Sequence, residues 1–245
     1  MHTSRHAQPR RTSQAARRSR TSDGGPRGGD FCVVVALPDG RTGVGIGDVA
    51  GHGAPVAGLM VRLRAAMRAE AAGGTAPAVL LQRLGALLGA LDPDAMATAA
   101  YAVVDPATRT AVHASAGHLP FVCAAGGGAW VVQAPVGPPL GVCDDIRHEE
   151  QVTALPEGAT LLACTDGLVE RRGEDLDAGV QRLCRAVRDH AAADVADHVD
   201  AVFATLAPGS SDDVTLVGVR PAAPAGRWSL RLGAAPTRVG SPWQR

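Results

Sequence analysis

The chain has no lysine and very few aromatic residues. All 24 of its basic residues are arginine, and this together with the many alanines, glycines and prolines indicates a codon bias toward G and C rather than a functional demand. Aromatic residues make up only 3% of the 245 residues, although 46% are hydrophobic. The core must therefore be built from small side chains such as alanine, valine and leucine, which requires close packing of the secondary-structure elements.

Net charge and long apolar runs are also missing. A formal net charge of +0 and a pI of about 7.1 give no overall attraction to nucleic acid or to an anionic membrane. No stretch approaches the ~18 consecutive apolar residues that a membrane span needs, and no apolar segment follows the basic N-terminus. We expect a cytoplasmic protein that neither enters a membrane nor depends on nucleic acid.

The cysteines form no metal-binding or disulfide pattern. There is no Cys-x-x-Cys, and the five cysteines are scattered through apolar runs, which is typical of buried free thiols in a reducing compartment. The pair His2 and His6 has metal-ligand spacing but lies in a segment expected to be disordered, so a zinc site is not predicted.

Composition divides the chain into three parts. Residues 1–27 are rich in arginine, serine and glycine without apolar periodicity, and residues 221–245 form a Pro/Ala/Gly/Arg-rich tail, so both are expected to be disordered. The basic segment is interpreted as a solvated tail or a misassigned start, with nucleic-acid contact as the alternative. Residues 28–220 are long enough for a single domain with a substantial core.

Hydrophobic periodicity within 28–220 alternates between hairpin strands and pairs of helices. The triplet Gly126 to Gly128 is interpreted as a turn, because no Lys-Ser/Thr continuation makes it a phosphate loop. Strands joined by hairpins, with helices in pairs, predict an α+β layered architecture. The expected strands are 31–37, 42–47, 97–104, 110–115, 119–124, 130–133, 160–164 and 214–219, and the expected helices are 54–72, 77–91, 176–191 and 194–206.

Acidic residues stand where three of these strands begin or end. Asp48 and Asp166 each follow an apolar run, and Asp212 with Asp213 precedes the last one. Carboxylates gathered in this way repel one another unless cations neutralise them, and Mg²⁺ or Mn²⁺ prefers such oxygen ligands. The pattern indicates a metal-assisted hydrolase, although Asp48 alone would also suit a helix N-cap or a turn.

Two histidines follow glycines in loop-like segments. His52 lies in Gly-His-Gly and His118 in Ala-Gly-His-Leu-Pro. Either could donate a proton near neutral pH, or could hold its loop by hydrogen bonds. The glycine-rich turn around His52 also has backbone amides that could face an anion.

The order of these motifs resembles that of the bacterial PP2C-like serine phosphatases of the sporulation stage II E / sigma-B regulator type, in the PPM family. The resemblance implies an α-β-β-α sandwich of two antiparallel sheets flanked by helix pairs. It also implies two Mn²⁺ or Mg²⁺ ions and hydrolysis of phosphoserine or phosphothreonine on a protein, such as an anti-sigma-factor antagonist. The matching segments are GGDF (28–31), GDVAGHG (47–53), AGH (116–118), GPPLG (137–141), TDGLVE (165–170) and DDVT (212–215).

By this resemblance Asp48 would bridge both metals, and His52 would be the acid for the leaving serine. The further metal ligands would be the Val49 carbonyl, Asp166, Asp212 or Asp213, and Asp30; the phosphate or substrate contacts would be Gly51, Gly53 and His118.

The sequence departs from the family pattern in two places. Cys32 and Val33 stand where a Tyr-Asp or similar pair is usual, so one carboxylate is missing. No strand pattern is visible upstream of Gly28, which would leave a sheet edge unpaired and favour a homodimer or lower stability. The alternative function is therefore a catalytically weakened scaffold that acts as a protein-binding regulatory module.

Overall fold

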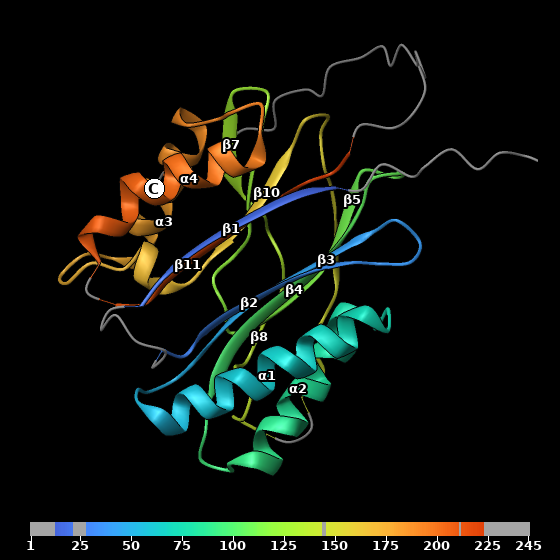
Figure 1. The fold of residues 1–245 in the computed structure, drawn as a ribbon, viewed down its shortest axis with the longest axis vertical. Helices are drawn as coiled ribbons and strands as arrows, with labels where there is room; N and C mark the ends of the chain where they lie inside the picture. Colours follow the sequence, from blue (N-terminus) through green and yellow to red (C-terminus); the bar gives the residue numbers. More distant parts are fainter. Residues whose placement is uncertain (1–12, 22–27, 144–145, 211, 223–245) are drawn as a thin grey trace, which may run out of the picture.

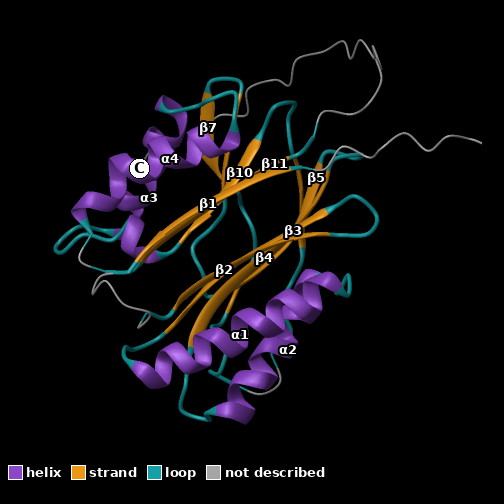
Figure 2. Ribbon diagram, viewed as in Figure 1, coloured by secondary structure: helices purple, strands orange, loops and turns teal. Residues whose placement is uncertain are grey.

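The structure is a computed structural model that describes residues 13–21, 28–143, 146–210 and 212–222. Two β-sheets lie face to face, with one pair of helices on each outer face (Figures 1 and 2). The predicted α-β-β-α sandwich is confirmed. Within the described part of the chain, no helix combines the length and the apolar character that crossing a membrane requires.

The first sheet is built around the predicted hairpins. β2 (Asp30–Ala36), β3 (Thr42–Val49), β4 (Ala97–Asp105) and β5 (Thr110–Ala116) are antiparallel neighbours in chain order. Two short strands complete it along β5: β8 (Val136–Gly137), which pairs in parallel, and β9 (Gln151–Ala154), which pairs in antiparallel fashion.

The second sheet has the order β1, β11, β10, β6, β7. Its strands are β1 (Gln14–Arg20), β11 (Val214–Arg220), β10 (Thr160–Cys164), β6 (Val122–Ala125) and β7 (Gly128–Val131). Gly126 and Gly127 join β6 to β7 with positive φ values of 58° and 79°, as a two-residue hairpin turn requires. The interpretation of the glycine triplet as a turn is confirmed.

Each helix pair buries one apolar face. α1 (Ala54–Ala72) and α2 (Pro77–Leu91) cover the first sheet, while α3 (Leu176–Asp189) and α4 (Val195–Leu206) cover the second (Figure 1). A third apolar cluster fills the space between the sheets. All five cysteines are free, as predicted.

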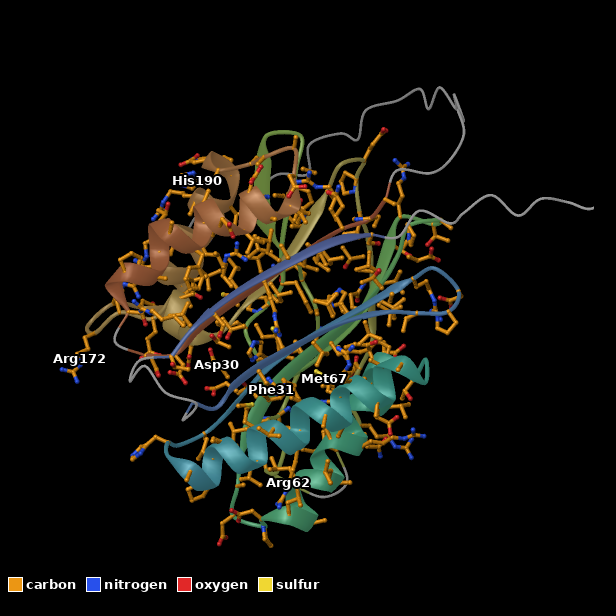
Figure 3. All side chains as sticks on the ribbon, viewed as in Figure 1. Asp30, Phe31, Arg62, Met67, Arg172 and His190 are labelled. Carbon is orange, nitrogen blue, oxygen red and sulfur yellow. The ribbon has the colours of Figure 1, made fainter. Side chains whose placement is uncertain are left out.

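Glycines in β3 make room for the few large side chains of the core. A Cβ on Gly43 would lie 2.2 Å from the hydroxyl oxygen of Tyr101, and one on Gly45 would lie 2.3 Å from Sδ of Met67. Tyr101 and Met67 are fully buried, and Figure 3 shows Met67 between α1 and the sheet. These glycines let the neighbouring side chains of α1 and β4 pack directly onto the backbone of β3, and this close packing fills a core that has few aromatic residues.

Strand β1 corrects the expectation that no strand precedes Gly28. Gln14–Arg20 pairs along its whole length with β11, although most of its residues are exposed. Arginine contacts replace apolar burial: Nη2 of Arg18 lies 2.5 Å from Oδ2 of Asp200 on α4. An apolar pattern could not reveal such a strand, because backbone pairing and charged side chains hold it in place.

The expected homodimer rested on an unpaired edge of the sheet at β11, and β1 covers that edge. A charged, exposed edge strand such as β1 also discourages pairing with a further chain. Disorder was also expected in the rest of 1–27 and in 221–245. Of these segments the structure describes only 13–21 and 221–222, and the other residues lie outside the described part of the chain.

Candidate metal and phosphate site

The acidic residues singled out in the sequence lie at strand ends on both sheets. Asp30 begins β2 and is the register partner of Asp48 near the end of β3. On the other sheet, Asp166 follows β10 as the first residue of the short 3-10 helix η1 (Asp166–Leu168), and Asp212 with Asp213 directly precedes β11. Asp30 lies between the two layers in Figure 3.

A cavity of about 500 Å³ opens where these strand ends meet. Asp48, Asp166, Asp212 and Asp213 all contribute to its wall, so residues from both sheets are brought together. Asp30 and Val49 are outside the lining. The residues that line it are Thr21, Gly28, Gly29, Asp48, Ala50, Gly51, His52, Gly53, Met96, Ala97, Thr98, Asp166, Asp212 and Asp213.

Burial raises the pKa values of three carboxyls of the site, and neighbouring carboxylates add to the effect. Burial, and then the neighbouring carboxylates, raise the pKa of Asp48 to about 8. Burial raises the pKa of Asp30 to about 7 against the opposing hydrogen bonds of the Thr165 and Thr215 hydroxyls. The pKa of Asp166 is raised by burial and by Asp212. Ionising these carboxyls is therefore unfavourable in the protein alone, and bound cations would make it favourable.

The two glycines before Asp30 have a steric role at the site. A Cβ on Gly29 would lie 2.2 Å from the Val49 carbonyl oxygen and 2.4 Å from Oδ1 of Asp48. A Cβ on Gly28 would lie 1.4 Å from Oδ2 of Asp213. Only glycine permits this approach, so the backbone before β2 packs directly against three oxygen atoms that could serve as metal ligands.

These residues fit a hard divalent cation in their chemistry. Carboxylate and carbonyl oxygens are the ligands that Mg²⁺ and Mn²⁺ prefer. In the described part of the chain, no three acidic, histidine or cysteine side chains stand close enough to hold an ion as they are. The fit therefore comes from the donor type and the crowding of charge, not from a closed cage.

The turn before α1 presents His52 and backbone amides to the cavity. Gly51 and Gly53 adopt positive φ values of 103° and 92°, and His52 between them is exposed. Gly53 is the N-cap of α1 and offers no side chain to the first-turn amides. The amides of Ala54 and Val56 in that turn are available to an anion, whereas Pro55 has no N–H to offer. The alternative that Asp48 caps this helix is wrong, because Asp48 belongs to β3.

His118 is buried beside the cavity and is held by hydrogen bonds. Its Nδ1 lies 2.8 Å from Oγ1 of Thr98, and its backbone N–H donates to Oγ of Ser115 at 3.2 Å. Burial lowers its pKa to about 4, so the ring is neutral near pH 7. His118 lines a neighbouring cavity of about 320 Å³ together with Asp48 and Asp166. Its loop-holding role is established, and phosphate contact stays a prediction.

Three threonines of the site are not among the residues that the sequence pattern singled out. Thr21 and Thr98 line the large cavity, and Thr165 donates a hydrogen bond of 2.7 Å to Oδ2 of Asp30. Thr98 is the register partner of Asp48 on β4, so the correct pairing of the predicted strands would have placed it there. Thr165 was visible as the residue before Asp166, but its bond to β2 depends on the packing of the two sheets.

Comparison with known proteins finds similar proteins both among the curated ones and among the solved structures. Phosphoserine phosphatase RsbP of Bacillus subtilis is 25% identical over 183 residues, which cover 73% of this chain and 44% of RsbP. The chain thus spans less than half of that relative. Of the solved structures, the RsbU and RsbW domains of Rv1364c from Mycobacterium tuberculosis align with a TM-score of 0.76 and 25% identity, over 87% of this chain and 62% of the other.

A further solved structure covers most of both chains. The SiaA-PP2C domain of Pseudomonas aeruginosa aligns with a TM-score of 0.70 and 25% identity, over 84% of this chain and 85% of that domain. The profile of the stage II sporulation protein E family matches residues 38–221, which contain most of the sandwich and nearly all of the acidic residues described above. The chain belongs to the stage II sporulation protein E (SpoIIE) family of PP2C-like serine phosphatases.

Proposed function

We propose that the protein is a metal-dependent serine/threonine phosphatase that removes phosphate from phosphoserine or phosphothreonine in a protein substrate. The observation that carries this proposal is the convergence of Asp48, Asp166, Asp212 and Asp213 from two sheets on one cavity. The glycine-rich turn before α1 lines the same cavity, so groups for cations and for an anion lie together.

Asp48, Asp166 and Asp212 or Asp213 would hold two Mn²⁺ or Mg²⁺ ions, with the Val49 carbonyl and Asp30 as further ligands. Such ions, when bound, neutralise phosphate charge and lower the pKa of water. Asp48 is suited to a shared position because all the other carboxylates of the site act on it electrostatically. Gly28 and Gly29 keep the backbone of the β2 start against these oxygens.

The chain's own groups would bind the phosphate and move the proton. Gly51 and Gly53 place the first-turn amides of α1 beside the cavity, where the helix dipole favours an anion. His52 is exposed on the cavity wall, and its imidazole would donate a proton to the leaving serine oxygen. His118, buried next to Thr98, would orient substrate from the neighbouring cavity.

The substrate follows from the resemblance of the motifs, which implies a phosphorylated anti-sigma-factor antagonist. RsbP, one of the curated relatives, is named a phosphoserine phosphatase, in agreement with serine as the phosphorylated residue. We place the protein in the cytoplasm on its five free cysteines, which suit a reducing compartment.

The alternative is a catalytically weakened scaffold that binds a protein partner. Two features of the sequence favour it: no strand pattern is visible before Gly28, and Val33 stands where a carboxylate is usual. β1 removes the first motive, and Val33 is buried in the apolar cluster under α1, away from the cavity. The open spacing of the acidic side chains is the observation that still favours the scaffold.

Hydrolysis of p-nitrophenyl phosphate by the full chain, titrated with MnCl₂, distinguishes the two functions. Asp48→Asn and Asp166→Asn should each lower the rate by about 100-fold or more. Asp94→Asn changes an exposed aspartate outside the cavity and is the control. An inactive wild-type protein would support the scaffold, and activity that survives both cavity substitutions would refute the site.

A further inference from the structure

Strand β1 ends beside the acidic cavity, whose lining includes Thr21, and it pairs with the start of β11 just after Asp212 and Asp213. Arg20 is the register partner of Val214, which follows Asp213, and Ser19 is the partner of Thr215. We infer that β1 is a positioning element of the site, in which Arg20 positions the Asp212–Asp213 segment and Ser19 positions Asp30. This inference rests on the proposed function in so far as these aspartates bind cations.

Arg20 is bonded to the segment that carries Asp212 and Asp213. Its Nη2 donates to the Ala207 carbonyl oxygen at 2.7 Å and to the Ser210 carbonyl oxygen at 3.0 Å. Ser210 in turn fixes the next turn, because its Oγ accepts from the Asp212 N–H at 3.0 Å and donates to the Asp212 carbonyl at 3.2 Å. One guanidinium on β1 thus braces the chain just before the two carboxylates.

Ser19 reaches Asp30 through two threonines. Its Oγ lies 3.1 Å from Oγ1 of Thr215, and the Thr215 N–H donates to Oγ1 of Thr165 at 2.9 Å. Thr165 Oγ1 donates to Oδ2 of Asp30 at 2.7 Å. Because Thr165 Oγ1 accepts from the Thr215 N–H, its single hydroxyl proton is free to be donated to Asp30. The chain of bonds therefore runs from the outer strand of one sheet to the first residue of the other sheet.

Arg18 provides a matched control on the same strand. Its Nη2 pairs with Asp200 on α4, on surface positions where both side chains are nearly half exposed, and it is not among the cavity residues. Replacing Arg18 or Arg20 by glutamine removes the same charge from the same strand. Loss of a positive charge near carboxylates would by itself strengthen cation binding. Weaker binding in Arg20→Gln could therefore not come from the lost charge and would indicate lost positioning.

Isothermal titration of the full chain with MnCl₂ tests the inference. We expect Arg20→Gln to raise the Kd for Mn²⁺ about tenfold, as loss of groups that orient metal ligands commonly does. Ser19→Ala should raise it severalfold, Arg20→Lys should restore part of the affinity, and Arg18→Gln should stay within twofold of wild type. Equal affinity of Arg20→Gln and wild type, or equal losses in Arg18→Gln and Arg20→Gln, would overturn the inference.

Hydrogen exchange in the metal-free protein separates this inference from the proposed function. Amides of the segment around Ser210 and Asp212 should exchange about tenfold faster in Arg20→Gln than in Arg18→Gln. Unchanged exchange there would refute positioning by Arg20 whether or not Mn²⁺ binds. The wild-type protein could bind no Mn²⁺ and so give the same titration as Asp48→Asn, which would refute the metal site. Faster exchange in Arg20→Gln would in that case still uphold the positioning role of Arg20.

Discussion

Asp30 and Asp48 stand directly opposite each other as register partners on the neighbouring strands β2 and β3. Like charges at opposed positions of an antiparallel pair destabilise it. In this protein both carboxyls have raised pKa values, about 7 for Asp30 and about 8 for Asp48, with burial as the first cause. Without metal, Asp30 and Asp48 therefore keep their protons at a pH where ordinary aspartates are ionised.

Removing the Asp48 carboxyl should stabilise the metal-free protein strongly at pH 8 and much less at pH 5. The folded-state pKa of about 8 lies above the ordinary value of 3.8. Between these two pH values the folded state binds more protons than the unfolded state, so the stability of the protein falls as pH rises. Asp48→Asn removes that loss. With a chelator present, its melting temperature should exceed that of wild type by several degrees at pH 8, since about 1 kcal/mol corresponds to about 2–4 °C. Asp94→Asn is the control, and a gain independent of pH would contradict the expectation.

Manganese should reverse the order of stability of the same two proteins. A ligand that binds only the folded state stabilises it by about 2.7 kcal/mol at a concentration 100 times the Kd. Wild type should gain several degrees in melting temperature with excess MnCl₂, whereas Asp48→Asn should gain almost nothing. Equal gains in both proteins, measured by scanning calorimetry, would show that the ions bind elsewhere.

Gly29→Ala should abolish Mn²⁺-dependent phosphatase activity. The new Cβ would lie 2.2 Å from the Val49 carbonyl oxygen and 2.4 Å from Oδ1 of Asp48, so β3 must shift at the point where the site is built. Gly89→Ala on α2 is the matched control, because its Cβ meets nothing within 4 Å. That helical substitution should stabilise the fold by about 1 kcal/mol without changing the rate. Wild-type activity in Gly29→Ala would refute the steric role.

Thr98→Val and Thr153→Val should separate stability from activity. Each change removes the hydroxyl partner of a buried histidine: Thr98 for His118 at 2.8 Å, and Thr153 on β9 for His113 at 2.9 Å. Both should cost about 1–3 kcal/mol in chemical denaturation. Only Thr98 lines the cavities that contain Asp48, so only Thr98→Val should also lower kcat/KM. Equal kinetic losses would mean that these histidines serve the fold alone.

The sequence predicted the elements that apolar side chains define and missed those held by other forces. The strand at 160–164 was predicted with its observed limits, because every one of its residues is buried. Strand β6 begins at Val122 rather than at 119, since Leu119 and Pro120 belong to the loop beside the second cavity. β1 was missed because its pairing and its arginine contacts exist only once β11 is in place.

The candidate site divides in the same way. The acidic residues were recognisable because each stands at the end of an apolar run, and four of them line one cavity. Thr165 could not be recognised as a partner of Asp30, since 135 positions separate them in the chain and only sheet packing brings them together.

The two sheets contribute opposite halves of the acidic cluster, Asp48 from one and Asp166 and Asp213 from the other. Any cation shared between these halves would act as a non-covalent cross-link between the layers. Removal of the cation would then loosen the packing of the two sheets against each other. The apolar cluster between the sheets, called here the interlayer seam, contains Cys32 and Cys123. Thiol accessibility in this seam would thus report on occupancy of a site in which no cysteine takes part.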